Sequence, residues 1–156
     1  MGRKAVEQKT RELVCFIRKK MVHATPEELI RQRLLQVMIG TWHYPAALIS
    51  VEKSLSELSW GRSVPNRRID IVAYHKVGHE LLPLLLIECK AVALQKESWG
   101  QLLGYNEAIQ APFFALMAGD DFYCFAADGT AVAALPYYDR LLSMVTKSSP
   151  STISTG

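Results

Sequence analysis

Three charged residues of the kinds that serve in catalysis interrupt two apolar segments of the chain. Asp70 lies in the segment 67–74, RRIDIVAY, and Glu88 and Lys90 lie two residues apart in the segment 84–91, LLLIECKA. Burying such charges costs on the order of several kcal/mol unless they pair with each other or hold an ion. A metal-dependent active site is therefore the first hypothesis for these residues.

Strand geometry would bring the three charges together. Side chains alternate along a strand, so Glu88 and Lys90 share one face. A polar turn around Gly78 predicts an antiparallel pair of strands, which would place Asp70 opposite Glu88 with about 5 Å between their β-carbons. Two carboxylates that close repel each other unless a cation lies between them, and hard oxygen ligands favour Mg²⁺, with Mn²⁺ as a substitute.

A lysine beside such a site has two catalytic uses. Lys90 could polarise an attacking water, or it could neutralise the charge that builds up when a phosphodiester bond is cleaved. The alternative is that Asp70, Glu88 and Lys90 form a cross-strand salt bridge on a solvated face. Spacing alone leaves both readings open.

The first third of the chain predicts a hairpin followed by a helix. The apolar run 13–17 and the segment 21–23 are typical of a short hairpin, and a helix continuing from the polar arm is the alternative. Thr25 as N-cap, Pro26 at the first helical position and Glu28 in a capping box predict a helix that ends near Gly40. Glu28 therefore has two readings, as a capping residue or as a member of the charged site. The apolar residues of this helix recur at helical spacing: Leu29, Ile30, Leu34, Val37 and Met38.

The remaining segments alternate between strands and helices, which predicts an α/β fold. We expect a strand at 47–51, a polar connection at 54–66, the two strands that carry the charges, a helix capped by Ser98, a strand at 112–117, a hairpin over 122–135 and a last helix at 138–145. We expect one domain over 12–147, preceded by a polar arm at 1–11. The Ser/Thr-rich segment 148–156 predicts a disordered tail.

Composition is that of an ordinary globular protein. The chain has 156 residues, of which 49% are hydrophobic and 21% charged, and a net charge of +3 that permits a nucleic-acid partner without requiring one. Its three cysteines are far apart in apolar runs, which favours buried reduced thiols over disulfides or a zinc site. No signal peptide or membrane span is apparent, so we expect a cytoplasmic protein with no membrane partner.

An Asp strand followed by a Glu-X-Lys strand resembles the PD-(D/E)XK nuclease superfamily. The chain is most similar to one branch, the N-terminal nuclease domain of type I restriction enzyme R subunits, from about Leu13 to Ala126. Four segments carry the resemblance in the family's order: 25–32 (TPEELIRQ), 68–72 (RIDIV), 86–91 (LIECKA) and 101–105 (QLLGY). The resemblance implies a restriction-endonuclease-like core with a central mixed β-sheet flanked by helices.

The resemblance also implies roles for the charged residues. Asp70 and Glu88 would bind the metal together with the backbone carbonyl of Cys89, and Lys90 would assist the nucleophile. Glu28 would reach the same cluster from the first helix.

Further residues are implied as contacts to DNA. Gln101, which the resemblance also places in the catalytic group, and Tyr105 share one helix face, from which they could contact the DNA backbone or steady the lysine. Arg67 and Arg68 directly precede the Asp strand and could guide phosphate, although a solvated strand entrance explains them equally well.

Three functions follow as hypotheses. The first is a Mg²⁺-dependent DNA endonuclease that hydrolyses phosphodiester bonds with metal-activated water. The second is a module of nuclease fold that binds nucleic acid or a partner subunit of a restriction or repair system without cleaving. The third is a structural domain with a surface cluster of salt bridges.

The partners follow from what the chain does not contain. It has no G-x-x-x-x-G-K-[ST] phosphate loop, so we expect no ATP site here and a motor or specificity subunit acting in trans. Cleavage of both DNA strands needs two active sites, which favours a homodimer.

Overall fold

The computed structural model describes residues 11–92, 96–132 and 136–147. Most of the expected arm at 1–11 and the whole expected tail at 148–156 lie outside these residues, so both stay predictions, as do the domain boundaries. The elements are, in chain order, β1 (Glu12–Val14), β2 (Met21–His23), α1 (Pro26–Gly40), η1 (Ala46–Leu48), β3 (Ile49–Ser54), α2 (Leu55–Leu58), β4 (Arg68–Val77), β5 (Glu80–Lys90), α3 (Lys96–Ile109), β6 (Phe113–Ala118), β7 (Asp121–Ala126) and α4 (Tyr138–Lys147).

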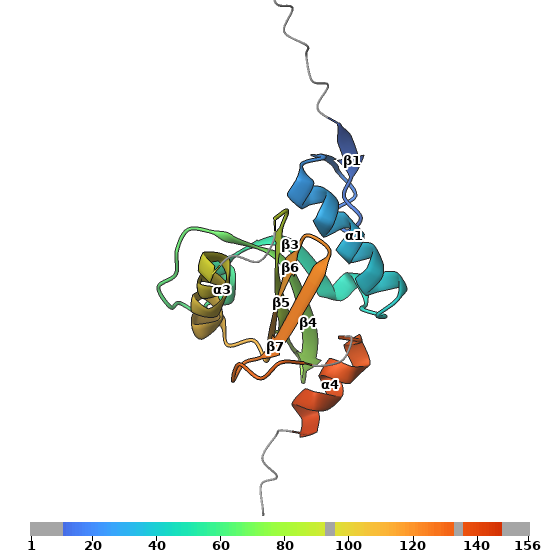
Figure 1. Cartoon of the computed structure of the whole chain (residues 1–156). Coiled ribbons are helices and arrows are strands. Elements are labelled where there is room, and N and C mark those ends of the chain that lie inside the picture. Colours follow the sequence, from blue (N-terminus) through green and yellow to red (C-terminus); the bar gives the residue numbers. More distant parts are fainter. Residues whose placement is uncertain (1–10, 93–95, 133–135, 148–156) are drawn as a thin grey trace, which may run out of the picture.

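A mixed sheet of five strands forms the centre of the molecule. The strand order is β3-β4-β5-β6-β7, and β5 and β6 are parallel while the other neighbours are antiparallel. Figure 1 views this sheet nearly edge-on, with α3 on one side and α1 and α4 on the other. The α/β fold with a central mixed sheet flanked by helices is confirmed, and it is consistent with a restriction-endonuclease-like core.

Each face of the sheet packs into its own hydrophobic core, because side chains alternate along β4 and β5. Ile71 and Ile87 face the core that α1 and α4 cover, whereas Val72 and Leu86 face the core that α2 and α3 cover. Burial on both faces explains why these strands read as nearly continuous apolar runs. A charge within such a run can escape burial only near the end of its strand.

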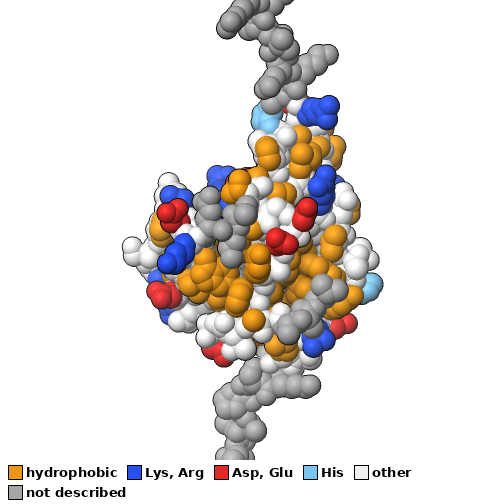
Figure 2. Space-filling view, in the orientation of Figure 1, with side chains coloured by type: hydrophobic (Ala, Val, Ile, Leu, Met, Phe, Trp, Pro, Cys, Tyr) orange, Lys and Arg blue, Asp and Glu red, His pale blue; other side chains and the backbone are white. Residues whose placement is uncertain are grey.

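The edge strand β7 is held by aromatic contacts on both sides. The Trp99 and Phe125 rings lie 4.4 Å apart between their centroids on the α3 side, and Trp42 and Phe122 lie 5.3 Å apart on the α1 side. Figure 2 shows hydrophobic side chains gathered on both sides of this strand. Such contacts help to stabilise β7, which is the last strand of the five-stranded sheet.

Helix α1 begins where the sequence predicts, but its buried face differs from the expected one. Thr25 Oγ1 accepts a hydrogen bond from the Glu28 N–H (3.1 Å), and Pro26 occupies the first turn. Leu29 and Val37 are exposed. The buried residues include polar ones, because this face also covers the charged end of the sheet: Glu28, Arg31, Gln32, Leu34, Leu35 and Met38.

Other boundaries confirm or correct the expectations. The β1–β2 hairpin forms, so the alternative of a helix there is wrong. The polar connection at 54–66 contains the short helix α2, and the strand expected at 47–51 begins only at Ile49, after a 3-10 turn. Helix α3 begins two residues before the predicted cap Ser98. The second arm of the hairpin over 122–135 is described only up to Val132, with a bridge from Phe125 to Ala131.

Candidate active site

Asp70 and Glu88 meet where β4 and β5 separate. The last paired residues there are Ile71 and Ile87, so Asp70 and Glu88 are the next positions of the two strands. The Asp70 N–H donates to Glu88 Oε1 at 3.2 Å, and the Cys89 N–H donates to Asp70 Oδ2 at 2.8 Å. The predicted antiparallel pairing through the turn at Gly78 is thus confirmed, and each carboxylate is oriented by the neighbouring strand.

Burial disfavours a negative charge on both Asp70 and Glu88 at the same time. Burial, followed by the negative charge of Asp70, raises the pKa of Glu88 to about 8. Burial also raises the pKa of Asp70, against the opposing effects of the Cys89 N–H and the Arg31 guanidinium. The two carboxylates therefore need a positive partner if both are to be ionised at neutral pH.

Lys90 and the Cys89 backbone complete this end of β5. Lys90 is half-buried, and its positive charge acts on Glu88, two residues away on the same strand. The N–H and C=O of a strand residue point toward the same neighbouring strand. Because the Cys89 N–H reaches Asp70, its carbonyl faces β4 as well. Two carboxylates and a carbonyl thus face the same gap between β4 and β5.

Helix α1 contributes Glu28 to this region through Arg31. The Thr25 N–H donates to the His23 carbonyl (2.9 Å), so the Glu28 carboxylate does not complete a capping box. It pairs instead with the Arg31 guanidinium and accepts from Gln32 Nε2 at 2.9 Å. Arg31 in turn donates to Asp70 Oδ1 at 3.3 Å. Glu28 is therefore connected to Asp70 by way of Arg31.

Strand β3 adds a further acid. Glu52 Oε1 lies 3.3 Å from Arg31 Nη1, and Glu52 Oε2 lies 2.8 Å from Arg18 Nη1. Although burial opposes it, these two guanidinium groups lower the pKa of Glu52. The region is thus a network of carboxylates and guanidinium groups that surrounds the Asp70 side chain.

The residues expected to contact DNA lie in two environments. Gln101 is exposed on α3, whereas Tyr105, four residues later, is 8% exposed and packs in the α3-side core. Arg67 and Arg68 are exposed at the start of β4. Their contacts with DNA stay predictions.

A family model covers the elements from α1 to β7. The family model of the type I restriction enzyme R protein N terminus matches residues 26–136, which is more than half of the chain. The chain belongs to this family. No curated protein matches the sequence of the chain.

For this member of the R protein N-terminus family, the sequence missed three residues of the charged network. Arg31 lies three residues after Glu28, a spacing that places both on one helix face. Glu52 can be placed opposite Asp70 only once the register of the β3–β4 pairing is known. Arg18 comes from the loop of the β1–β2 hairpin, and no sequence pattern indicates it.

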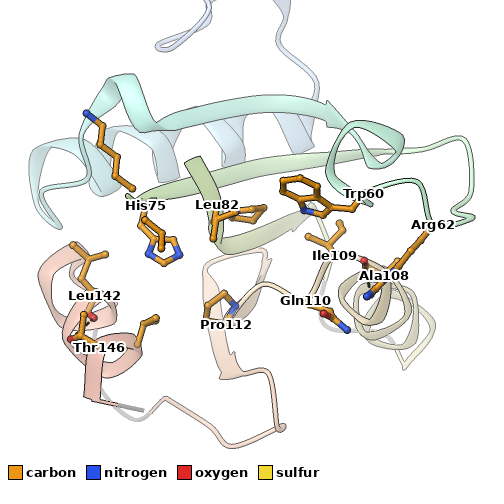
Figure 3. A pocket seen from close by; sticks show the side chains of 14 residues that line it. Trp60, Arg62, His75, Leu82, Ala108, Ile109, Gln110, Pro112, Leu142 and Thr146 are labelled. Atoms are coloured by element: carbon orange, nitrogen blue, oxygen red, sulfur yellow. Dashed lines mark hydrogen bonds between the residues drawn. The ribbon is translucent and has the colours of Figure 1, made fainter. Parts of the chain in front are cut away.

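A groove on this R protein module lies apart from the charged site. Its volume is about 750 Å³, and Figure 3 shows side chains from the β4–β5 hairpin, the end of α3, the loop after α2 and α4 around it. Leu82 and Pro83 line it at the start of β5, whereas Glu88 and Lys90 lie at the other end of that strand. Arg62, also on its wall, donates to the carbonyls of Glu107 and Ala108 and so caps α3. None of the described residues that line this groove is Asp or Glu, so they offer no carboxylate ligand for a metal ion.

The donor set fits a hard divalent cation through Asp70 and Glu88. Among the described residues, no group of three or more His, Cys, Asp or Glu side chains could hold a metal ion. Glu28 and Glu52 form ion pairs with Arg18 and Arg31. The candidate metal ligands are therefore the Asp70 and Glu88 carboxylates and the Cys89 carbonyl. Mg²⁺ commonly uses one or two carboxylates and fills its other positions with water and phosphate.

Within the described residues, no helix is long and apolar enough to cross a membrane.

Proposed function

We propose that this module is a Mg²⁺-dependent DNA endonuclease whose active site is the gap between the ends of β4 and β5. The observation that carries this proposal is the juxtaposition of Asp70, Glu88 and Lys90 in a member of the R protein N-terminus family. Asp70 and Glu88, with the Cys89 carbonyl, would hold the metal, with Mn²⁺ as a substitute.

The residues of the chain divide the chemistry between them. A bound Mg²⁺ supplies Lewis-acid activation of water and of the phosphoryl oxygen. The Cys89 N–H and the Asp70 N–H hold the two carboxylates in place, so little reorganisation is needed when charge develops. Lys90 lies on the Glu88 face of β5, where its ammonium group can orient a water or neutralise the phosphate in the transition state.

The test is cleavage of supercoiled plasmid DNA by purified protein in Mg²⁺ and in chelator. We expect the wild-type protein to nick the plasmid in Mg²⁺ only, and Asp70→Ala, Glu88→Ala and Lys90→Ala to lose this activity while circular dichroism shows a retained fold. Glu80→Gln, an exposed change on the same strand, is the matched control and should cleave like the wild type. Mg²⁺-dependent nicking that persists in Asp70→Ala would overturn the assignment.

A second function is favoured by the contact between Arg31 and Asp70. This cation already neutralises part of the site, so a module that binds DNA or a partner subunit without cleaving is the competing proposal. A gel shift with DNA in chelator, followed by addition of Mg²⁺, separates the two. Binding without cleavage on duplex, nicked and single-stranded substrates would favour the second function.

A further inference from the structure

Three acids form one row across three neighbouring strands. In the β3–β4 ladder, Val51 pairs with Ile71 and Lys53 pairs with Ile69, so Glu52 faces Asp70 at the position that the ladder omits. On its other side Asp70 faces Glu88. Like charges directly opposite each other in a sheet repel, so Glu52 beside Asp70 requires an explanation.

Arg31 lies between the first two acids of this row. Its Nη1 is 3.3 Å from Glu52 Oε1 and 3.3 Å from Asp70 Oδ1, so neither carboxylate holds it exclusively. Its Nη2 is paired with Glu28 on the same helix. The buried Nε has no hydrogen-bond partner among the described residues. The guanidinium is therefore paired with Glu28 through Nη2 and shared between Glu52 and Asp70 through Nη1, and its Nε is unpaired among the described residues.

The backbone at Glu52 is held in an unfavourable conformation. Its φ is 53°, in the left-handed region that side-chain-bearing residues rarely adopt, although it lies within a strand. Arg18 Nη1 binds its Oε2 at 2.8 Å. Strained backbone that the surroundings maintain is concentrated at functional sites. In this conformation the Glu52 carboxylate lies within reach of Arg31.

We propose that Arg31 is a reversible counter-cation of Asp70 and that Glu52 is the positioning residue that receives its guanidinium. The inference rests on the proposed function, because it concerns how Asp70 is made available to a divalent cation. Without that cation, Arg31 offsets the charge of Asp70. When Asp70 takes a divalent cation as partner, the Arg31 guanidinium turns about its Nη2 contact with Glu28, and its Nη1 pairs with Glu52 and no longer with Asp70. Glu52 thereby lowers the cost of separating Arg31 from Asp70.

The test is a titration of the full chain with Mn²⁺ in the absence of DNA. The electron paramagnetic resonance signal of free Mn²⁺ measures how much of the ion is bound. We expect Glu52→Gln to weaken Mn²⁺ binding roughly tenfold, a typical size for coupling between two binding events, because Asp70 is then the only carboxylate left within reach of Arg31 Nη1. Glu27→Gln is the matched control. Glu27 is exposed, its charge also reaches Asp70, and the described residues include no ion pair to it, so this variant should change binding by no more than about twofold.

A second variant separates loss of the Glu52 carboxylate from loss of the fold. Glu52→Gly removes the carboxylate but suits a positive φ, so it should remain folded and bind Mn²⁺ as weakly as Glu52→Gln does. Wild-type affinity in Glu52→Gly, or equal weakening in Glu52→Gln and Glu27→Gln, would overturn the role of Glu52. Wild-type protein that binds no Mn²⁺, or Asp70→Ala that binds as well as wild type, would instead overturn the proposed metal site and this inference with it.

Discussion

At the scale of single residues, position within the strand decides what the acids can do. Asp70 and Glu88 lie where the β4–β5 pairing ends, so their carboxylates reach partially solvated space while their backbones remain fixed by the sheet. Arg31 offsets part of the charge, and its own side chain is 9% exposed. A buried guanidinium among carboxylates is retained only when several contacts satisfy it.

The raised pKa of Glu88 predicts how the stability of the metal-free protein depends on pH. Its folded pKa is about 8 and its ordinary value is 4.5. Between these values the folded state holds a proton that the unfolded state has released, so rising pH favours unfolding. In chelator, the free energy of unfolding should fall as the pH rises from about 5 to 8 and then level off. Glu88→Gln should remove most of this loss.

Urea denaturation of the wild type and of Glu88→Gln at several pH values measures this effect. At pH 8 the variant should be more stable by on the order of a few kcal/mol, from about 1.4 kcal/mol for each pKa unit, whereas near pH 4.5 the two proteins should agree. Glu80→Gln should follow the wild type throughout. Parallel curves for the wild type and Glu88→Gln would show that Glu88 does not keep its proton on folding.

The sequence indicated Asp70, Glu88, Lys90 and Glu28 as members of this charged cluster and missed Arg31, Glu52 and Arg18. Alternation within strands and a turn at Gly78 were enough to bring Asp70 beside Glu88, because both rules act over short distances along the chain. Glu52 and Arg18 were missed for a physical reason. Glu52 depends on the β3–β4 register and on a left-handed backbone conformation, and Arg18 depends on where the hairpin docks. Neither is encoded in local periodicity.

At the scale of elements, α1 serves the site and the core at once. Its first two turns carry Glu28 and Arg31, and its later turns bury Leu34 and Met38 against the sheet. The N-cap residue Thr25 could be identified from sequence because its hydrogen bond to the Glu28 N–H is local. Helix α2 and the 3-10 turn were missed because short helices depend on the neighbouring elements rather than on propensity.

Loss of the N-cap of α1 should cost stability without removing the charged network. Thr25→Ala removes the acceptor for the Glu28 N–H and should lower the free energy of unfolding by about 1 kcal/mol. The Arg31 and Gln32 contacts of Glu28 do not involve Thr25, so Mn²⁺ affinity should stay within about twofold of the wild type. Denaturant unfolding and Mn²⁺ titration measure the two effects separately.

The control for this prediction is Thr41→Ala, at the other end of α1. Thr41 is exposed and caps the helix through its backbone N–H to the Val37 carbonyl (2.9 Å), which alanine retains. It should therefore be nearly neutral for stability. Equal destabilisation by both substitutions would mean that the Thr25 side chain does not cap the helix.

At the scale of the whole molecule, the mild net charge of +3 leaves any contact with DNA to local clusters. Arg67 and Arg68 are exposed at the start of β4 and lie three and two residues before Asp70 in the sequence. Phosphate contacts near the carboxylates would direct the backbone of DNA into the gap between β4 and β5. Such contacts would carry no sequence preference.

Replacing these arginines should weaken DNA binding equally for all sequences and reduce its dependence on salt. Each phosphate contact contributes about 0.9 to the slope of log affinity against log salt concentration. Arg67→Gln with Arg68→Gln should therefore lower the slope by up to about 2, as measured by fluorescence anisotropy with duplex DNA in chelator. Arg33→Gln, an exposed change on α1, removes the same kind of charge elsewhere and should change the slope little. If all three arginines contribute equally, the positive charge acts as a diffuse field, and the start of β4 is not the path by which DNA reaches Asp70 and Glu88.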